Sequence, residues 1–311
     1  MNDTRRAVLA ALADGPLSGP ALAESLDVSR AAVWKHVEAL RDDGFEIEST
    51  DDGYRLGGFP EYSGLAIEHG LDTPYTVEYH DSIDSTNRRA RELAGDGAEN
   101  VVVIADEQTG SRGRLDRPWD APSGGVWASI VLRPNVPPAQ VPLLTLAAAV
   151  AVTRAAREAG VDAGIKWPND VLVETEDGTK KLSGILTEME GEADRVSWVV
   201  VGIGVNVDID VDELPDTATS VSDLVGEVDR RVFCQRVLES FHDLSTDLGT
   251  VLDAWREHAI TLGQRVRVET PSGDVVGEAV DVEYPGTLVV ETDEGTRRVS
   301  AGDCEHLRPT E

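Results

Sequence analysis

Basic residues and cysteines are scarce in this 311-residue chain. Its two cysteines, Cys234 and Cys304, are too few for a disulfide framework or a zinc site, which favours a reducing, cytoplasmic compartment. Against 58 acidic residues stand 28 basic ones, only four of them lysine, and the formal net charge is −30. An acidic, lysine-poor surface is typical of adaptation to high salt, where charges are screened over about 3 Å at 1 M. An ordinary acidic protein is the alternative.

Long hydrophobic runs are missing as well. The longest uncharged stretch, 134–153, contains four prolines, and its apolar part, 143–152, is much shorter than the roughly 20 residues of a membrane span. The N-terminus has no basic-then-apolar leader, because Arg5 and Arg6 precede an amphipathic pattern. We expect no membrane association. The length and the 41% hydrophobic content predict a globular chain of roughly two ordinary domains.

The first 60 residues have the element order of a winged helix-turn-helix domain. Helices are expected over 4–13, from Ser18, and from Ser29 to the stop at Gly44, because the two serines are good N-caps. Residues 45–56 then read as a β-hairpin with a tight turn, and 57–60 as an exit linker.

The remainder divides into a mixed segment, 61–262, and an all-β segment, 263–311. Apolar runs predict strands over 101–105, 126–132, 164–167, 171–173, 183–189 and 197–207, and periodicity predicts helices over 139–159 and 233–248. This order favours an α+β domain on a partly antiparallel sheet. Short β runs separated by Pro, Gly and Asp turns after 262 predict an SH3-like barrel.

The most unusual stretch is residues 110–119, where Arg112, Arg114 and Arg117 follow a predicted strand among glycines. Glycines let a backbone fold tightly around an anion, and guanidinium groups pair with phosphate or carboxylate. In a chain this acidic, the stretch predicts an anion-binding loop. The alternatives are a solvated loop, or arginines paired with the chain's own acids.

Four other segments carry candidate chemistry, and each also has an ordinary structural interpretation. Residues 166–170 place a lysine and a carboxylate at a strand end, where they suit a nucleotide and its magnesium, or form an Asx turn. Lys181 begins an apolar strand, where lysine often serves only solubility. The strand 202–207 contains two glycines, which suggests close approach of a ligand or backbone. Residues 85–87 open a helix and suit capping.

Taken together and in this order, these segments resemble biotin–protein ligases. The family's GRGRxxRxW loop corresponds to 111–119, its KWPND segment to 166–170, its KLxGIL strand to 181–186, its GIGxNV strand to 202–207 and its STN helix start to 85–87. The resemblance covers nearly the whole chain. It implies a class II synthetase-like mixed α/β catalytic domain over 61–262. The N-terminal winged helix and the C-terminal barrel are similar to those of family members that also repress biotin synthesis genes.

The resemblance implies ATP-dependent activation of biotin to biotinyl-5′-AMP and transfer of biotin to a lysine of a biotin carboxyl carrier protein. Lys181 and Arg114 are the expected catalytic residues. The expected biotin-binding residues are Ser85, Thr86, Asn87, Gln108, Arg112, Gly113, Arg114 and Lys181. The expected ATP-binding residues are Arg112, Arg117, Trp119, Asn169, Asp170, Lys181 and Asn206. Magnesium is expected to arrive with ATP, near Asp170, without a site made by protein ligands alone.

Two residues depart from the family loop. Ser111 stands at its first glycine, a mild change unless the position needs a positive φ. Asp116 stands where a glycine is frequent. Its carboxylate would either add negative charge beside the phosphate site or face solvent.

DNA binding by the N-terminal domain is an open alternative at this stage. Residues 1–60 contain eleven acids and six bases, a net charge of −5, whereas DNA phosphates require Lys or Arg. Ser29, Arg30, Trp34 and Lys35 would face a groove of operator DNA, with Arg5, Arg6 and Arg41 adding positive charge. Otherwise the domain serves packing or dimerisation. The resemblance also implies a homodimer in the adenylate-bound state.

Two other functions compete with this interpretation. Lipoate–protein ligases share the catalytic fold, but their glycine loop differs and they usually lack the N-terminal domain. A biotin-sensing transcription factor without ligase activity is the alternative from another class, and the retained Lys181 and loop arginines argue against it.

Overall fold

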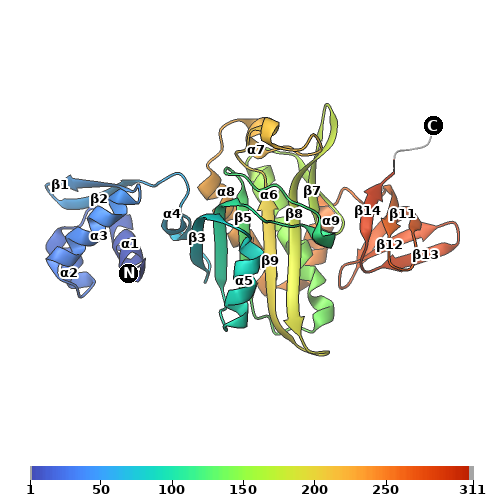
Figure 1. The fold of residues 1–311 in the computed structure, drawn as a ribbon, viewed down its shortest axis with the longest axis horizontal. Coiled ribbons are helices and arrows are strands. Elements are labelled where there is room, and N and C mark those ends of the chain that lie inside the picture. Colours follow the sequence, from blue (N-terminus) through green and yellow to red (C-terminus); the bar gives the residue numbers. More distant parts are fainter. Residues whose placement is uncertain (1, 308–311) are drawn as a thin grey trace. The chain divides into compact units, whose positions relative to one another are not determined.

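The computed structural model describes residues 2–307, and its contacts divide the chain into two compact units, Met1–Leu71 and Asp72–Glu311. Figure 1 follows the chain through both units. The domain limits expected from the sequence at 60 and 262 stay predictions, and the C-terminal sheet belongs to the same compact unit as the central sheet.

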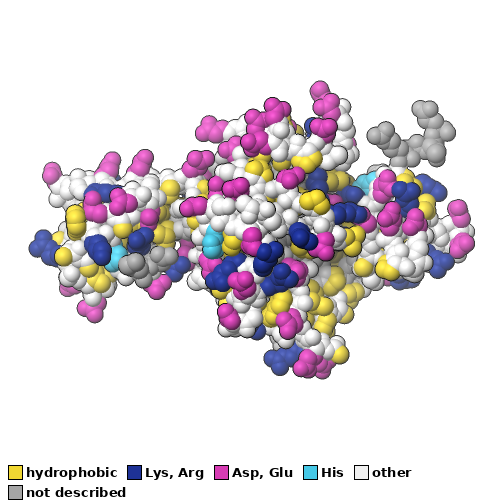
Figure 2. Space-filling view, viewed as in Figure 1, with side chains coloured by type: hydrophobic (Ala, Val, Ile, Leu, Met, Phe, Trp, Pro, Cys, Tyr) yellow, Lys and Arg dark blue, Asp and Glu magenta, His cyan; other side chains and the backbone are white. Residues whose placement is uncertain are grey.

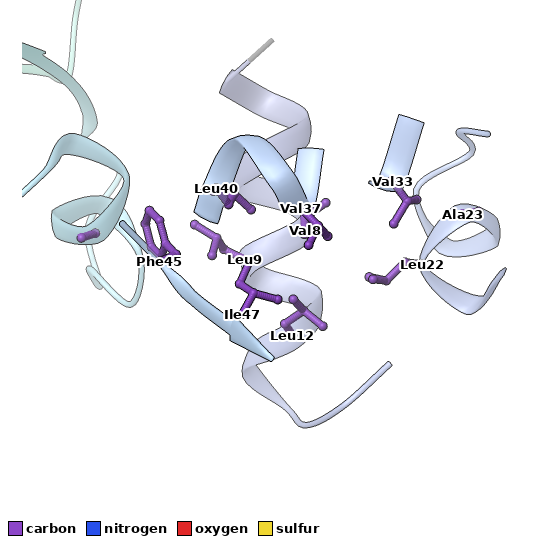
Figure 3. Packing of buried hydrophobic residues seen from close by; sticks show 11 residues of the cluster. Val8, Leu9, Leu12, Leu22, Ala23, Val33, Val37, Leu40, Phe45 and Ile47 are labelled. Carbon is purple, nitrogen blue, oxygen red and sulfur yellow. The ribbon is translucent and has the colours of Figure 1, made fainter. Parts of the chain in front are cut away.

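The first unit is the predicted winged helix-turn-helix. Its elements are α1 (Asn2–Ala13), α2 (Gly19–Ser25), α3 (Arg30–Asp42), β1 (Glu46–Thr50), β2 (Gly53–Gly58) and α4 (Gly64–Glu68). Ser18 and Ser29 cap α2 and α3 by accepting hydrogen bonds from backbone N–H groups three residues later. Figure 3 shows Leu9, Leu12, Val37 and Ile47 packed together from α1, α3 and β1, which orients the polar face of α3 outward.

The second unit is built on a seven-stranded sheet with the strand order β3-β4-β5-β9-β8-β7-β6. The strands are β3 (Thr76–Ile83), β4 (Val101–Gln108), β5 (Val126–Leu132), β6 (Ala163–Lys166), β7 (Asp170–Thr175), β8 (Gly178–Gly191) and β9 (Val196–Val205). Only the β3–β4 pair is parallel. The expected partly antiparallel sheet is confirmed, and the long β8–β9 pair forms its centre.

Helices cover both faces of this sheet. On one face, α5 (Thr86–Gly95) packs on β4, β5 and β9, and Arg91 reaches Glu188 of β8. On the opposite face, Thr145 of α6 (Pro142–Glu158) contacts Thr187, since neighbouring residues of a strand point to opposite faces. The other helices are α7 (Val221–Val225), α8 (Arg230–Thr246) and α9 (Val251–His258).

The segment 138–158, which contains α6, is long and apolar enough to cross a membrane by length and composition. In the fold, 72% of its most apolar window is buried. This is the position of a core helix in a globular unit, where a helix that is hydrophobic on all sides is expected. The apolar run 143–152, expected from the sequence to be too short for a span, lies inside this longer helix.

The C-terminal part is a five-stranded antiparallel sheet with the order β13-β12-β11-β10-β14. Its strands are β10 (Arg265–Glu269), β11 (Val275–Glu283), β12 (Thr287–Thr292), β13 (Gly295–Val299) and β14 (Asp303–His306). The small β domain expected from the sequence is therefore present. Five helices and strands were not predicted: the edge strand β3, whose sequence is largely polar, β14, which follows the last predicted run, and the helices α4, α7 and α9.

Candidate active site

A cavity of about 190 Å³ opens on the α5 face of the central sheet, at β8 and β9. Its base is made by glycines: Gly184 pairs with Gly204 and Gly202 pairs with Leu186 across the two strands. A Cβ at Gly202 would overlap the Asn87 carboxamide, and one at Gly204 would lie 3.2 Å from the Trp119 indole. The absence of a side chain at these glycines leaves room for Asn87 and Trp119 above them.

The N-terminus of α5 supplies one wall. Ser85 caps the helix by accepting from the Arg88 N–H, as the ordinary interpretation of this segment expects. The same turn also brings Ser85, Thr86 and Asn87 to the cavity, together with Gln108 at the end of β4. The Thr86 N–H donates to the Gln108 Oε1 atom at 2.8 Å. Helix capping and cavity lining are thus both served by this segment.

The arginine loop, residues 110–119, lines the cavity, and its three arginines already have partners. Arg114 donates to the Asn169 Oδ1 atom and to the Gly302 carbonyl, each at 2.8 Å. Arg117 pairs with Asp303 at 2.5 Å. Arg112 pairs with Asp116 at 3.3 Å and is well exposed. The alternative of arginines paired with the chain's own acids therefore describes Arg112 and Arg117, whereas Arg114 bonds an amide and a carbonyl, and all three arginines line the cavity.

The two departures from the family loop have local explanations. Ser111 is not among the residues with positive φ, and its hydroxyl donates to the Trp119 carbonyl at 2.6 Å, joining the two ends of the loop. Asp116 has a φ of 56°, a conformation that favours glycine and that Asp tolerates better than most residues. Its side chain is exposed beside Arg112.

Lys181 lies in the cavity beside an acidic and an aromatic side chain. Its Nζ atom is 2.7 Å from the Asp170 carboxylate and 5.0 Å from the centre of the Trp119 ring. The main chain of Lys181 is fixed at both of its polar groups: its N–H donates to the Thr217 carbonyl at 2.8 Å, and its carbonyl accepts from the Thr219 N–H at 3.1 Å.

The turn at 166–170 is anchored behind the cavity. Trp167 is buried, and its indole N–H donates to the Gly286 carbonyl of the C-terminal part at 3.0 Å. Asn169 donates to the Ile185 carbonyl at 2.9 Å while its oxygen accepts from Arg114. The turn therefore presents Asn169 and Asp170 to the cavity from a rigid support.

One expected nucleotide-binding residue lies elsewhere. Asn206 is 2% exposed and is absent from the cavity lining. Its side-chain amide donates to the Thr219 carbonyl at 3.0 Å, and its main-chain carbonyl accepts from the Val221 N–H. Asn206 thus holds the segment that flanks Lys181. Gly302, just before β14, and Asp303, its first residue, contact Arg114 and Arg117, and no motif in the sequence indicated them.

The charge of the cavity is opposite to that of the chain. Its charged lining residues are Arg112, Arg114, Arg117 and Lys181 against Asp170 and Asp303. Figure 2 shows acidic side chains spread over the visible face, with basic ones gathered over α5. Among residues 2–307, no group of three or more His, Cys, Asp or Glu side chains is arranged to hold a metal. The excess of positive side chains in the cavity lining suits an anionic ligand.

Comparison with known proteins identifies the family. Residues 79–206 match the biotin/lipoate A/B protein ligase family, residues 4–55 an HTH domain, and residues 261–307 the biotin protein ligase C-terminal domain. The chain is 41% identical over 307 residues to the bifunctional ligase/repressor BirA of Bacillus subtilis, covering 93% of both chains. It is 36% identical over 241 residues to the biotin–[acetyl-CoA-carboxylase] ligase of Mycobacterium tuberculosis, covering 70% of this chain and 84% of that protein.

The structural comparison agrees. The biotin protein ligase of Aquifex aeolicus, solved in complex with biotin and ATP, matches with a TM-score of 0.61 and 26% identity, covering 76% of this chain and all of that one. The chain belongs to the biotin protein ligase family. Its enzyme class is accordingly biotin–[acetyl-CoA-carboxylase] ligase, joined to a helix-turn-helix domain as in the ligase/repressors.

Replacing Gly202 by Ala tests whether the glycine base positions the α5 wall. The added methyl group would displace Asn87, an expected biotin ligand, and we expect the KM for biotin to rise by about tenfold or more. Pyrophosphate release at varied biotin measures it. Gly95→Ala in α5 is the control, because nothing lies within 4 Å of its added Cβ. An unchanged KM in a folded Gly202→Ala protein would contradict this account.

Proposed function

We propose that this cavity joins biotin to ATP as biotinyl-5′-AMP and passes the biotinyl group to a lysine of a biotin carboxyl carrier protein. The observation that carries the proposal is the convergence of four cationic side chains at one cavity of a chain with a net charge of −30. Family membership supports it. Of the competing functions, lipoate attachment is disfavoured by the match of residues 261–307 to a biotin protein ligase domain.

In the first step, a biotin carboxylate oxygen attacks the α-phosphorus of ATP and pyrophosphate leaves. Two unit negative charges 4 Å apart repel by about 1 kcal/mol in water and by several times more in a drier site. Lys181, Arg112 and Arg114 offset this repulsion and stabilise the charge that develops on the pentacovalent phosphorus. Lys181 would exchange the Asp170 carboxylate for the two substrates.

Polar groups at the N-terminus of α5 would bind biotin. Ser85, Thr86, Asn87 and Gln108 line one end of the cavity and offer hydroxyl and amide groups to the ureido ring and the carboxylate. Gly113 lies between Arg112 and Arg114 in the cavity lining. Because glycine has no side chain, its backbone would approach the ligand closely when the loop closes.

The other end of the cavity suits the nucleotide. Arg117 would exchange Asp303 for ATP phosphate, and Trp119 supplies an aromatic surface beside Lys181. Asn169 and Asp170 would face the nucleotide, and Mg²⁺ would reach Asp170 bound mainly to phosphate oxygens and water, the usual arrangement for this ion. It would supply positive charge to the leaving pyrophosphate. Asn206 would act indirectly, through the segment that it holds beside Lys181.

In the second step, the neutral amine of the carrier lysine attacks the biotinyl carbonyl carbon and AMP leaves. The carrier supplies the nucleophile, so the cavity needs no nucleophilic side chain. Closure of the arginine loop would exclude water, which would otherwise hydrolyse the mixed anhydride.

Lys181→Ala should lower biotin-dependent pyrophosphate release by at least about a hundredfold, the scale of losing one electrostatic donor at a transition state. Lys180→Ala removes the neighbouring lysine, which is outside the cavity lining, and should leave turnover near that of the unmodified protein. Arg114→Ala should behave like Lys181→Ala. Near-normal turnover in Lys181→Ala would remove this residue from the mechanism.

We further propose that the N-terminal unit binds operator DNA and that the chain forms a homodimer when biotinyl-AMP is bound. Ser29, Arg30, Trp34 and Lys35 are all exposed on α3 or at its cap, and Trp34 is 59% exposed. Arg5, Arg6 and Arg41 pair with carboxylates of the same unit, so Arg30 and Lys35 carry the positive charge of this face. For dimerisation, β3 is an edge strand of the central sheet.

Both proposals are tested in the presence of biotinyl-AMP. A DNA fragment carrying the promoter of a biotin transport or synthesis gene should be retarded in a gel, and sedimentation velocity should report a dimer. Arg30→Ala with Lys35→Ala should abolish retardation, because phosphate contacts supply much of the affinity. Lys180→Ala, a lysine outside this unit, is the control. No retardation of the unmodified protein would favour a packing role for the domain.

The charge supports a third proposal, that the protein works in the cytoplasm of a cell with a high salt content. Self-repulsion of a chain with a net charge of −30 falls as the screening length shortens from about 10 Å at 0.1 M to about 3 Å at 1 M. The unfolding temperature Tm should therefore rise steadily between 0.1 and 2 M KCl, measured by circular dichroism. Sodium chloride at equal ionic strength should act similarly. A Tm that is flat or falls with salt would contradict the proposal.

A further inference from the structure

The side-chain amide of Asn87 is held by three groups of the protein. Its Nδ2 atom donates to the Glu188 Oε2 atom at 2.9 Å and to the Leu186 carbonyl at 3.4 Å. Its Oδ1 atom accepts from the Ser129 hydroxyl at 2.6 Å. Both N–H bonds of the amide are therefore used by the protein. The Ser129 hydroxyl also lies 2.8 Å from the Thr86 hydroxyl, and its single hydrogen serves one of the two acceptors, so the Asn87 oxygen keeps at least one free lone pair.

Glu188 determines which way this amide faces. A carboxylate accepts hydrogen bonds and cannot donate them. If the Asn87 amide were rotated by 180°, its oxygen would face the Glu188 carboxylate and its nitrogen would face Ser129. That arrangement sets two acceptors against each other at hydrogen-bond distance and is unfavourable. Glu188 thereby fixes the nitrogen toward β8 and leaves the oxygen as the acceptor.

Glu188 itself is held from the other side. Arg91 lies 3.2 Å from its Oε1 atom, whereas Asn87 uses Oε2, so the two oxygens have separate partners. The Glu188 side chain is 30% exposed and does not line the cavity, while Asn87 does. Glu188 thus contacts a cavity residue from behind, without access to a ligand in the cavity.

We propose that Glu188 is a positioning residue that makes Asn87 a hydrogen-bond acceptor and so selects a ligand with a ring N–H, such as a cyclic urea. The inference rests on the proposed function of this cavity as the biotin site. It attributes part of the selectivity of the cavity for biotin to Glu188. Because the remaining lone pair of Oδ1 would then have no donor, a ring that lacks the N–H would bind less tightly.

Replacement of Glu188 by Gln reverses the arrangement without changing the shape. Arg91 only donates, so it takes the oxygen of the new side chain, whose amide nitrogen then faces Asn87. The Leu186 carbonyl, at 3.4 Å, opposes the rotation only weakly, so Asn87 would rotate to accept from this nitrogen and would place its own nitrogen where its oxygen was. We expect E188Q to raise the KM for biotin by about tenfold, the scale of one hydrogen bond, with the KM for ATP and kcat changed less than about twofold.

The matched control is Glu190→Gln. Glu190 lies two residues further along β8, is exposed, and loses the same charge on substitution. It should leave the KM for biotin unchanged, so a general effect of net charge is separated from the effect on Asn87. Kinetics are followed by pyrophosphate release on the full-length protein.

A second variant tests the direction of the hydrogen bond. N87D places a carboxylate against Glu188, and biotin binding should weaken strongly. In N87D/E188Q the amide nitrogen introduced at position 188 can donate to the new carboxylate at position 87, which keeps an oxygen toward the cavity. The KM for biotin should then recover at least about fivefold relative to N87D. The same E188Q change is harmful beside an amide and beneficial beside a carboxylate, which a purely structural role of Glu188 does not predict.

Three results would overturn the inference: an E188Q protein with the KM for biotin of E190Q, equal changes in the KM for biotin and for ATP, or an N87D/E188Q protein no better than N87D. Failure of the proposed function is distinct, because the unmodified protein would then show no biotin-dependent pyrophosphate release.

Discussion

Repulsion between two anionic substrates is the constraint on which the rest of this structure depends. A carboxylate and a triphosphate meet only where positive charge is concentrated, and this chain has few basic residues to concentrate. Three arginines of one loop and one of only four lysines lie at the same cavity. Each is held by the chain's own acceptors, such as Asp170 for Lys181 and Asp303 for Arg117. The cations therefore lie at the cavity before a substrate arrives, and the anionic substrates would take the place of Asp170 and Asp303.

The C-terminal sheet takes part in this arrangement. Gly302 and Asp303 hold Arg114 and Arg117, and the Gly286 carbonyl accepts from the buried Trp167, which supports Asn169 and Asp170. The site thus draws on residues separated by more than a hundred positions in the chain. A domain that supplies none of the motif residues fixes the orientation of several that do.

Local motifs were readable from the sequence because they depend on short-range chemistry. Glycine alternating with arginine, a lysine at the start of an apolar strand, and serine N-caps each predict a local structure, and the elements around them form as expected. Long-range partners gave no such signal. Asp303 and Glu188 are ordinary acids among 58, and only the folded register brings them to Arg117 and Asn87. The strand β3 escaped prediction because a polar edge strand lacks the apolar run that identifies a buried one.

The main chain at Lys181 has a consequence for affinity. Its peptide N–H donates to the Thr217 carbonyl, and its carbonyl accepts from the Thr219 N–H. The side-chain amide of Asn206 in turn donates to the Thr219 carbonyl. Backbone freedom at this position is thus lost when the protein folds, and only the rotamers of one flexible side chain remain to be ordered by a ligand. On its proposed role, the entropy that Lys181 loses on association would be correspondingly small, so its attraction for the two anions would be expressed almost fully in the bound state.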